Sequence, residues 1–283
     1  MPWFLVLPGV VALLAFHYLP VAFGSYYAFT KWDGLGHAAW VGVANFREIF
    51  ADPFARGALY HTLELAAGYT VAVNAIGLGL ALGLNRAVKT RHLLRSLFFA
   101  PVAINGLAVA YIWQWVFTYD GALNLVLGDV GLGSWKRIWL ADPRIAIWTI
   151  LLVMVWQGSG LAMVFYLAGL QAIPDEVYEA TLVDGASPWL RFRKVVLPLL
   201  APAITISATL SMIRGMHVFE TVMALTGGGP VDATETLATQ LYKQTWVLGR
   251  FGYGAAFALT LSALVGVMAL TQLALLRRNE ARL

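Results

Sequence analysis

The chain has 283 residues, of which 60% are hydrophobic and only 12% are charged. A soluble domain carries about 25% charged residues, so this composition indicates a protein whose solvent is lipid. The absence of cysteine excludes disulfides, thiolate metal sites and cysteine nucleophiles. The net charge of +4 requires no nucleic-acid partner, because basic residues at the ends of apolar segments account for it.

Six apolar segments are long enough to cross a membrane as helices, since a span needs roughly 20 mainly apolar residues. In chain order they are Pro2–Phe29, Thr62–Leu84, Leu97–Thr118, Ile145–Gly169, Leu199–Leu225 and Tyr253–Leu276. The first has no Lys or Arg before its apolar run and no obvious small-residue cleavage site, unlike a secretory signal peptide. We expect a retained helix there, with Pro8 and Pro20 bending it or marking its ends.

Basic residues cluster in the connections that share a side of the membrane with the N-terminus. These clusters are dense and contain few acidic residues. They are Arg86, Lys89, Arg91 and Arg95; Arg191, Arg193 and Lys194; and Arg277, Arg278 and Arg282. The connections on the other side are longer, and their basic residues alternate with acidic ones. By the positive-inside rule, the clusters mark the cytoplasmic side. We therefore predict an all-α polytopic protein of one domain, 1–283, with six spans and both termini in the cytoplasm.

The fourth predicted span contains the stretch Trp156-Gln157-Gly158-Ser159-Gly160. Trp156 offers an apolar face to a ligand, and Gln157 offers both a hydrogen-bond donor and an acceptor. Two glycines either let a ligand come close or let a neighbouring helix pack tightly. Ligand contact and helix packing both stay open here. Asn74, Asn105, Trp113 and Gln114 are weaker candidates of the same kind.

A polar loop of unusual length, Gln171–Leu200, separates the fourth and fifth spans. Pro174 favours a helix start, and acidic residues follow it in the first turn, where the helix dipole favours them. Gly185 can adopt the left-handed backbone that ends a helix. Ser187, before Pro188, is a good N-cap for a second helix. The sequence predicts two short helices joined at a sharp corner. An amphipathic connector lying on the membrane is the alternative.

The residue types in the polar loop follow the order found in a known family of loops. Glu179-Ala180, Asp184-Gly185-Ala186 and Leu197-Pro198 follow one another at fixed distances. This series resembles the EAA loop of ABC importer permeases. The resemblance implies the type I importer permease fold and a helix pair that inserts into a cleft of an ATPase subunit. It assigns coupling to Glu179, Ala180, Asp184, Gly185 and Ala186.

The fifth predicted span carries ionisable residues, which are costly in a membrane and are functional candidates by default. Arg214, His217 and Glu220 recur every three residues, so neighbours lie within reach on one helix. They either satisfy one another as a ladder or line a polar cavity. Both interpretations stay open.

A glycine loop, Thr226-Gly227-Gly228-Gly229-Pro230, follows the fifth span. With Ala233–Thr236, Tyr242…Trp246 and Trp40…Asn45-Phe46, it is similar to permeases of the maltose and glycerol-phosphate type, and to the first of the two permeases in such systems. The resemblance makes the glycine loop a contact for an extracytoplasmic solute-binding protein. It also places sugar contacts around Met154–Leu161 and Ser211–Val218. With Glu220 added, the predicted cargo pathway is Trp156, Gln157, Gly158, Ser211, Arg214, Gly215, His217, Val218 and Glu220.

The chain contains no G-x-x-x-x-G-K-[ST] phosphate-binding loop. ATP and Mg²⁺ are therefore expected on partner subunits, and this chain is expected to hold no cofactor. It also shows no paired catalytic carboxylates or metal-ligand cluster, which argues against an enzyme. The resemblance implies a transport subunit in a prokaryotic cytoplasmic membrane, working with a second permease, two ATPase copies and a solute-binding protein. A permease for glycerol phosphate or a peptide is the alternative. The hypothesis of an ion-coupled secondary transporter has less support, because two related halves and mid-membrane carboxylates are not apparent in the sequence.

Overall fold

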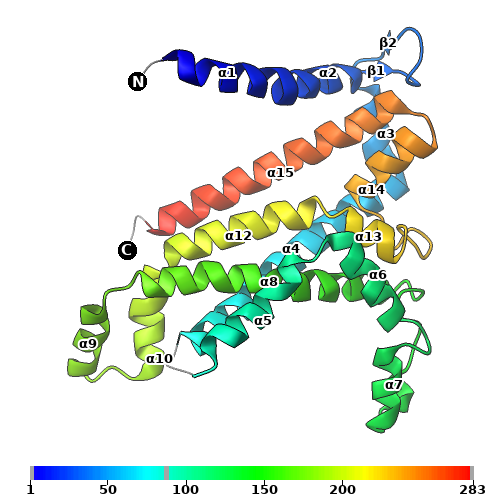
Figure 1. Ribbon diagram of the computed structural model, residues 1–283. Coiled ribbons are helices and arrows are strands. Elements are labelled where there is room, and N and C mark those ends of the chain that lie inside the picture. The colour runs from blue at the N-terminus through cyan, green and yellow to red at the C-terminus, as the bar shows by residue number, and fades with distance from the viewer. Residues whose placement is uncertain (1–2, 86–88, 281–283) are drawn as a thin grey trace. The chain divides into compact units, whose positions relative to one another are not determined.

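The computed structural model describes residues 3–85 and 89–280 (Figure 1). Pro2, Arg86 and Arg282, on which the sequence predictions relied, lie outside the described residues. The described residues are mostly helical, and the only strands among them are β1 (Thr30–Lys31) and β2 (Ala39–Trp40). The predicted all-α membrane fold is therefore confirmed.

Four single helices are long and apolar enough to cross a membrane. They are Val6–Tyr27, Pro53–Leu84, Ala146–Gln171 and Phe251–Leu276. Two further helix pairs pass the same test together but are bent within the pair, so the described residues give up to six spans if each pair counts as one. The third and fifth predicted spans are the ones affected.

The predicted span Leu97–Thr118 is a bent helix pair in the structure. Helix α5 (Arg91–Ala103) and helix α6 (Gly106–Val116) meet at an angle of 98°. Ile104 and Asn105 between them have extended backbone, and the Asn105 side chain accepts a hydrogen bond from an N–H in the first turn of α6. Asn is a strong N-cap, so it starts a new helix here and does not extend the old one.

The fifth predicted span, Leu199–Leu225, is not one helix either. Helix α12 (Ala201–Met216) ends before His217, and helix α13 (Glu220–Leu225) starts after a short irregular stretch. The His217 ring lies 3.0 Å from the Ile213 carbonyl, where it caps the last turn of α12. Upstream, Pro188–Leu199 meets α12 at 68°, at a point where prolines remove backbone donors.

The described helices form two compact units. Unit 1 comprises Met1–Tyr60 and Glu235–Leu264, and unit 2 comprises His61–Thr234 and Val265–Leu283. Helices α4 (Pro53–Leu84) and α15 (Phe251–Glu280) each contribute to both units. The expectation of a single domain stays a prediction.

Unit 1 is built around its first helices and a small hairpin. Besides parts of α4 and α15, it contains α1 (Trp3–Leu13), the π-helical turn η1 (Leu14–Tyr18), α2 (Leu19–Tyr27), the strands β1 and β2, α3 (Ala44–Ala51), α14 (Leu237–Tyr242) and the π-helical turn η4 (Lys243–Val247). The strands pair antiparallel, with Thr30 opposite Trp40. The buried Asn45 amide donates to the Ala28 and Thr30 carbonyls, at 2.8 and 2.9 Å, and so fixes the hairpin to α3.

Unit 2 is organised around α8 (Ala146–Gln171), the most buried of the candidate spans. The rest of unit 2 comprises the main part of α4, α5, α6, α7 (Ala122–Asp129), the 3₁₀ turn η2 (Gly133–Trp135), α9 (Asp175–Val183), α10 (Pro188–Arg191), the π-helical turn η3 (Phe192–Val196), α11 (Leu197–Leu199), α12, α13 and the end of α15. Gly77 on α4 leaves no room for a side chain against Met163 of α8, and Gly160 of α8 lies directly against the Phe98 carbonyl. Small residues thus let α4 and α5 approach α8 closely.

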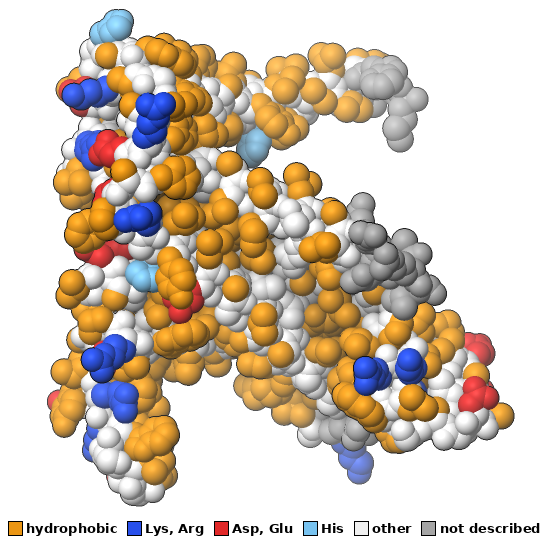
Figure 2. All heavy atoms as spheres, turned by 180° about the vertical axis from the view of Figure 1, so that it is seen from behind, with side chains coloured by type: hydrophobic (Ala, Val, Ile, Leu, Met, Phe, Trp, Pro, Cys, Tyr) orange, Lys and Arg blue, Asp and Glu red, His pale blue; other side chains and the backbone are white. Residues whose placement is uncertain are grey.

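The exposed surface of the long helices is apolar, as expected for a protein surrounded by lipid. Figure 2 shows hydrophobic side chains along the flanks of the long helices, with charged side chains gathered towards the helix ends. In unit 2, α9 and α10 lie at one end of α8, whereas α7 and α13 lie towards its other end (Figure 1). The polar loop and the glycine loop therefore belong to opposite ends of unit 2.

Candidate functional site

The polar loop folds as two short helices with a corner between them. Pro174 is the N-cap of α9, with Asp175 and Glu176 in the first turn. At the other end, Gly185 has a φ of 67°. The N–H groups of Gly185 and Ala186 donate to carbonyls of the last turn of α9, at 3.1 and 3.0 Å. This pattern is a Schellman motif, which closes the C-terminus of a helix with a left-handed residue.

The second helix of the polar loop has its own cap. The Ser187 hydroxyl accepts a hydrogen bond from the Leu190 N–H at 3.3 Å, and Pro188 occupies the first turn. The chain then continues through η3 and α11 into α12 with few unstructured residues. The polar loop is therefore a continuous mechanical link between α8 and α12.

The corner of the polar loop presents unpaired side chains. Glu179 and Asp184 are exposed, and neither has a hydrogen bond or ion pair within the part of the chain that the structure describes. Within the described residues, the nearby Arg191, Arg193 and Lys194 form no ion pair with either carboxylate. Val183 and Trp189 are also exposed, at 88% and 67%. Such a mixture of free carboxylates and apolar side chains is suited to contact with another protein.

Tyr178 faces the inner side of the polar loop and packs against the buried core of unit 2. Burial raises the pKa of its hydroxyl, the Arg191 guanidinium lowers it, and the Asp175 carboxylate raises it again. The net shift is upward, so the hydroxyl stays neutral across the physiological range.

A polar cavity of about 520 Å³ lies at the two helix breaks of unit 2. Its lining combines both breaks with the middle of α8: Tyr69, Val102, Ile104, Gly106, Met154, Gln157, Gly158, Arg214, His217, Val218, Phe219, Glu220 and Thr221. Interrupted helices expose backbone groups at membrane depth, where they are tolerated only inside protein or along a polar cavity. The same feature forms the binding sites of many transporters.

The charged groups of the polar cavity are held apart. The Arg214 guanidinium lies near the Tyr69 hydroxyl. A methyl group on Gly106 would lie 2.9 Å from a carboxylate oxygen of Glu220, so this oxygen sits over the first turn of α6. A helix N-terminus favours a negative charge at that position.

The predicted ladder on one helix is not what the structure contains. Arg214 lies in the last turn of α12, His217 lies in the break and Glu220 begins α13. Within the described residues, these three side chains form no ion pair or hydrogen bond with one another, and all three are exposed in the polar cavity. Polar groups of all three side chains therefore face the cavity, although one ring nitrogen of His217 is engaged by the Ile213 carbonyl.

Six of the predicted pathway residues meet in the polar cavity: Gln157, Gly158, Arg214, His217, Val218 and Glu220. Gln157 also donates to the Ile104 carbonyl at 3.1 Å and so satisfies the backbone at the first break. Gly158 leaves room for the Tyr69 hydroxyl, because a side chain there would collide with it.

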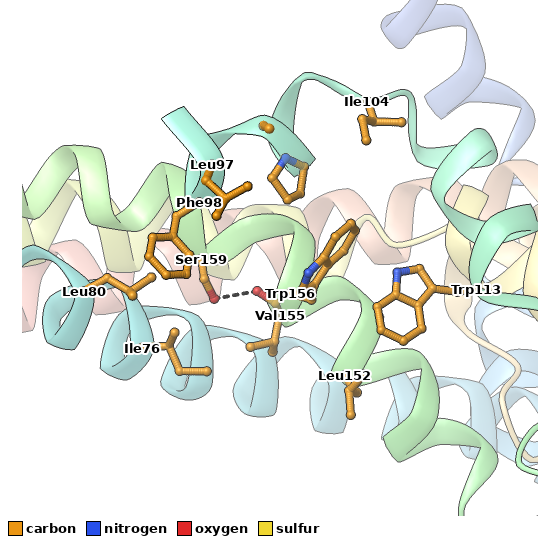
Figure 3. Close-up of a pocket in the computed structure, with 13 residues that line it drawn as sticks. Ile76, Leu80, Leu97, Phe98, Ile104, Trp113, Leu152, Val155, Trp156 and Ser159 are labelled. Atoms are coloured by element: carbon orange, nitrogen blue, oxygen red, sulfur yellow. Dashed lines mark hydrogen bonds between the residues drawn. The ribbon is translucent and has the colours of Figure 1, made fainter. Parts of the chain in front are cut away.

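Trp156, predicted on the same pathway, faces a different space. It lines an apolar cavity of about 730 Å³ with Trp113, and their rings meet edge to face at 5.4 Å (Figure 3). The Ser159 hydroxyl on the wall of this cavity donates to the Val155 carbonyl of its own helix. Adjacent residues on a helix point about 100° apart, which explains why Trp156 and Gln157 separate.

Ser211 and Gly215 lie in the packing between helices. The Ser211 hydroxyl donates to the Ser207 carbonyl at 2.6 Å and accepts from the Asn74 amide at 3.2 Å. A methyl group on Gly215 would lie 2.7 Å from the Ala66 Cα, so the glycine allows α12 to touch α4. Neither residue lines the polar cavity.

Tyr69, Ile104 and Gly106 line the polar cavity but were not predicted, whereas Asn105, a weaker candidate in the sequence, does not line it. Tyr69 gives no sequence signal, because it is one of many aromatic residues in apolar segments. The dipeptide Asn105-Gly106 after Pro101 is a recognisable helix-start signal in the middle of an apolar run. It identifies the first break in retrospect.

The glycine loop is an ordered turn of unit 2. Gly227 and Gly228 have φ values of 61° and 92°, and the Gly229–Pro230 peptide is cis. The Thr234 hydroxyl joins this turn to the end of α13, since it bonds the Gly229 carbonyl and the Thr226 hydroxyl, both at 2.7 Å.

Unit 1 contains a buried charge pair that sequence reasoning treated as ordinary loop charge. Glu235 is 1% exposed and is paired with the Lys243 ammonium. The Thr239 hydroxyl donates to the other carboxylate oxygen at 2.6 Å. The pair thus closes the segment around α14.

Residues 75–280 match the family described as binding-protein-dependent transport system inner membrane component. The multiple sugar-binding transport permease MsmF of Streptococcus mutans is 32% identical over 98% of this chain and 95% of its own length. The trehalose/maltose transport permease MalF of Thermococcus litoralis is 32% identical over 93% of this chain and 89% of its own length.

A solved structure agrees on the fold. A chain of a bacterial ABC transporter that imports the acidic polysaccharide alginate superposes with a TM-score of 0.85, at 22% identity, over 98% of this chain and 94% of that one. Together with the family match, this confirms the expected importer permease fold, whose role is transport and not catalysis. The chain belongs to the family of inner membrane components of binding-protein-dependent ABC importers.

Proposed function

We propose that this chain forms one half of the translocation pathway of an ATP-driven sugar importer. Its partners are a second permease, two ATPase subunits that carry ATP and Mg²⁺, and an extracytoplasmic solute-binding protein. Support for sugar as cargo comes from relatives at 32% identity whose names specify sugar transport. Both termini lie in the cytoplasm of a prokaryotic cell in this proposal, as the basic clusters indicate.

The observation that carries the proposal is the polar cavity. Gln157, Arg214, His217 and Glu220 bring amide, guanidinium, imidazole and carboxylate groups to one space inside otherwise apolar helices. Sugar hydroxyls need neighbouring donors and acceptors, and this set provides both. Because ionisable groups are expensive at membrane depth, their gathering around one cavity favours a transport role.

The polar loop would transmit force to this cavity. Closure of the ATPase subunits would push on the corner formed by Glu179, Ala180, Asp184, Gly185 and Ala186. The loop is continuous with α8 at one end and with α12 at the other. Since both helices line the polar cavity, a movement of the loop would change its shape and access. The glycine loop, at the opposite end of unit 2, would meet the solute-binding protein.

Reconstitution tests the proposal. The four-subunit membrane complex, placed in proteoliposomes with its binding protein, should take up a labelled oligosaccharide only when ATP is supplied. Arg214→Ala should weaken cargo binding by roughly 10- to 100-fold, because a hydrogen bond to a charged group contributes about 1.5–3 kcal/mol. Uptake of glycerol phosphate or a peptide, with no response to any sugar, would contradict the proposed cargo.

A further inference from the structure

The connection between α6 and α8 projects from the end of unit 2 that lies opposite the polar loop (Figure 1). It contains α7 and η2, and we call residues 122–138 the projecting segment. Helix α6 ends at Val116 and α8 begins at Ala146, so both ends of this connection lie at the ends of candidate spans. The projecting segment therefore stays at the level of the membrane surface. None of its residues lines the polar cavity, and the sequence motifs assigned it no role.

Asn124 fixes the projecting segment to the rest of unit 2. It is 1% exposed, and its side-chain oxygen accepts a hydrogen bond from Trp139 Nε1 at 2.9 Å. Its amide nitrogen donates to the carbonyls of Tyr119 and Arg137, at 3.0 and 2.9 Å. Leu123 and Trp139 pack against the buried core of unit 2. Because a buried amide joins the start of the segment to its end, the exposed side chains form a surface of fixed shape.

The exposed surface of the projecting segment is largely apolar. Six of its residues are large hydrophobic ones that are between 45% and 63% exposed: Leu125, Val126, Val130, Leu132, Trp135 and Ile138. Such a concentration of exposed apolar side chains marks contact with another protein or with lipid. The direction of α7 and the charges around it favour lipid.

The direction of α7 suits a helix that lies on a membrane. It runs across the direction of α8 and extends away from the other helices of unit 2 (Figure 1). Since α8 is a candidate span, a helix that crosses its direction at its end lies along the membrane surface. Figure 2 shows this segment at the lower left, with Lys and Arg side chains along its outer edge and hydrophobic side chains on the side turned towards the long helices. An amphipathic helix in the plane of a membrane has this arrangement, with its apolar side towards the lipid chains.

The charged groups of the projecting segment suit the headgroup region of a bilayer. A methyl group on Gly128 would lie 2.5 Å from Lys136 Nζ, so this ammonium group covers the last turn of α7, where the helix dipole favours a cation. Arg137 adds a second cation, whereas Asp129 is the only acidic residue between positions 122 and 138. The excess of positive charge favours anionic headgroups. An exposed tryptophan such as Trp135 is also typical of the membrane interface, because its ring has an apolar body and a polar N–H.

We propose that the projecting segment is an interfacial anchor, which lies in the headgroup region of the outer leaflet with Leu125, Val126 and Trp135 inserted among the lipid chains. The outer leaflet follows from the orientation that the basic clusters indicate. The partner of this surface is the bilayer and not a further protein. The anchor goes beyond the proposed transport function and does not depend on the cargo. It holds α6, whose other end is the break at Asn105, at a fixed depth while α8 and α12 move.

Single nitroxide labels test the anchor, since the chain has no cysteine of its own. Val126→Cys places a label on the exposed apolar surface of α7. Val231→Cys is the matched control, because Val231 is an exposed valine in the turn after the glycine loop, at the same end of unit 2. Leu125→Cys is a second position on the projecting segment, for use if the first variant does not assemble. The labels are measured on the complete membrane complex, with cysteine-free partner subunits, in nanodiscs of phosphatidylethanolamine and phosphatidylglycerol. Basal ATP hydrolysis checks assembly independently of any cargo.

Oxygen dissolves in lipid chains, whereas a polar nickel chelate stays in water. Collisions with oxygen should therefore relax the Val126 label faster than collisions with the chelate, and the order should be reversed at Val231. A Val126 label that the chelate reaches as readily as the Val231 label would overturn the proposal, because the surface would then face water. So would a label that is shielded from both reagents, or shielded only after the solute-binding protein is added, because a protein would then cover the surface. If the complex takes up no sugar but the Val126 label lies in lipid, the proposed cargo fails and the anchor stands.

Discussion

Gly185→Val is expected to uncouple the transporter without unfolding it. Gly185 closes α9 with a φ of 67°, and a side chain built on it meets no atom within 4 Å. The obstacle is therefore conformational and not steric crowding by neighbours. A left-handed backbone costs an L-residue roughly 1–2 kcal/mol, and a β-branched residue is a true outlier there.

The two backbone hydrogen bonds that Gly185 and Ala186 make to α9 oppose an opening of the corner, each by about 0.5–1.5 kcal/mol, and the substitution does not change them. The backbone penalty of about 1–2 kcal/mol lowers the ratio of the native corner to its alternatives by about 5- to 30-fold. Because the corner is exposed and outside the core, the melting temperature of the complex should hardly change.

The assay is stimulation of ATP hydrolysis by the cargo-loaded binding protein in proteoliposomes, with uptake measured in parallel. Gly185→Val should lower both by about 5- to 30-fold, while the complex still assembles. Gly185→Asn is the matched control, since Asn adopts the left-handed backbone more readily than other residues with a side chain, and it should keep most of the coupling. Equal loss with Val and Asn, or normal coupling with Val, would refute the reasoning.

Three further predictions address other parts of the chain. Arg214→Lys should retain charge but bind cargo less well than wild type, because Lys lacks the planar fork of donors, and the uptake KM reports this. Gly160→Leu should lower expression and thermal stability, since a side chain at Gly160 collides with the Phe98 carbonyl; normal melting would contradict the close packing. Lys243→Met should destabilise the complex by about 3–5 kcal/mol by leaving Glu235 buried without its cation, and Glu235→Gln in the same chain should restore part of the melting temperature.

Local signals in the polar loop were sufficient to predict its structure. Pro174, Gly185 and Ser187 each act on the backbone within a few residues, so the two helices and the corner follow from the sequence alone. The membrane-length helices could be predicted equally well, because the length of an apolar run is a property of a single segment.

The polar cavity was only partly predictable. Gln157, Arg214 and Glu220 were identified because polar residues are rare in apolar segments. Their arrangement depends on helix breaks at Asn105 and His217. The mean hydropathy of a window of about 20 residues does not reveal such breaks. The separation of Trp156 from Gln157 depends on the helix's rotation against its neighbours, which only the packed structure fixes.

Glu235 illustrates a different limit. Its side chain is 1% exposed and paired with Lys243, although the sequence around it reads as a polar connection. Glu235 lies just before α14 and Lys243 directly after it, so the pairing depends on the helical path of the chain between them. Charge in a loop therefore does not by itself indicate exposure.

The measurement that tests the central claim most directly is labelling of the polar cavity. Since the chain has no cysteine, Thr221→Cys introduces a single thiol in the lining of the polar cavity without removing any of its charged groups. A membrane-impermeant thiol reagent added from outside should modify it when ATP and the binding protein are present, and transported sugar should protect it. A thiol that stays unreactive in every state, or that sugar never protects, would contradict the assignment of this cavity to the translocation pathway.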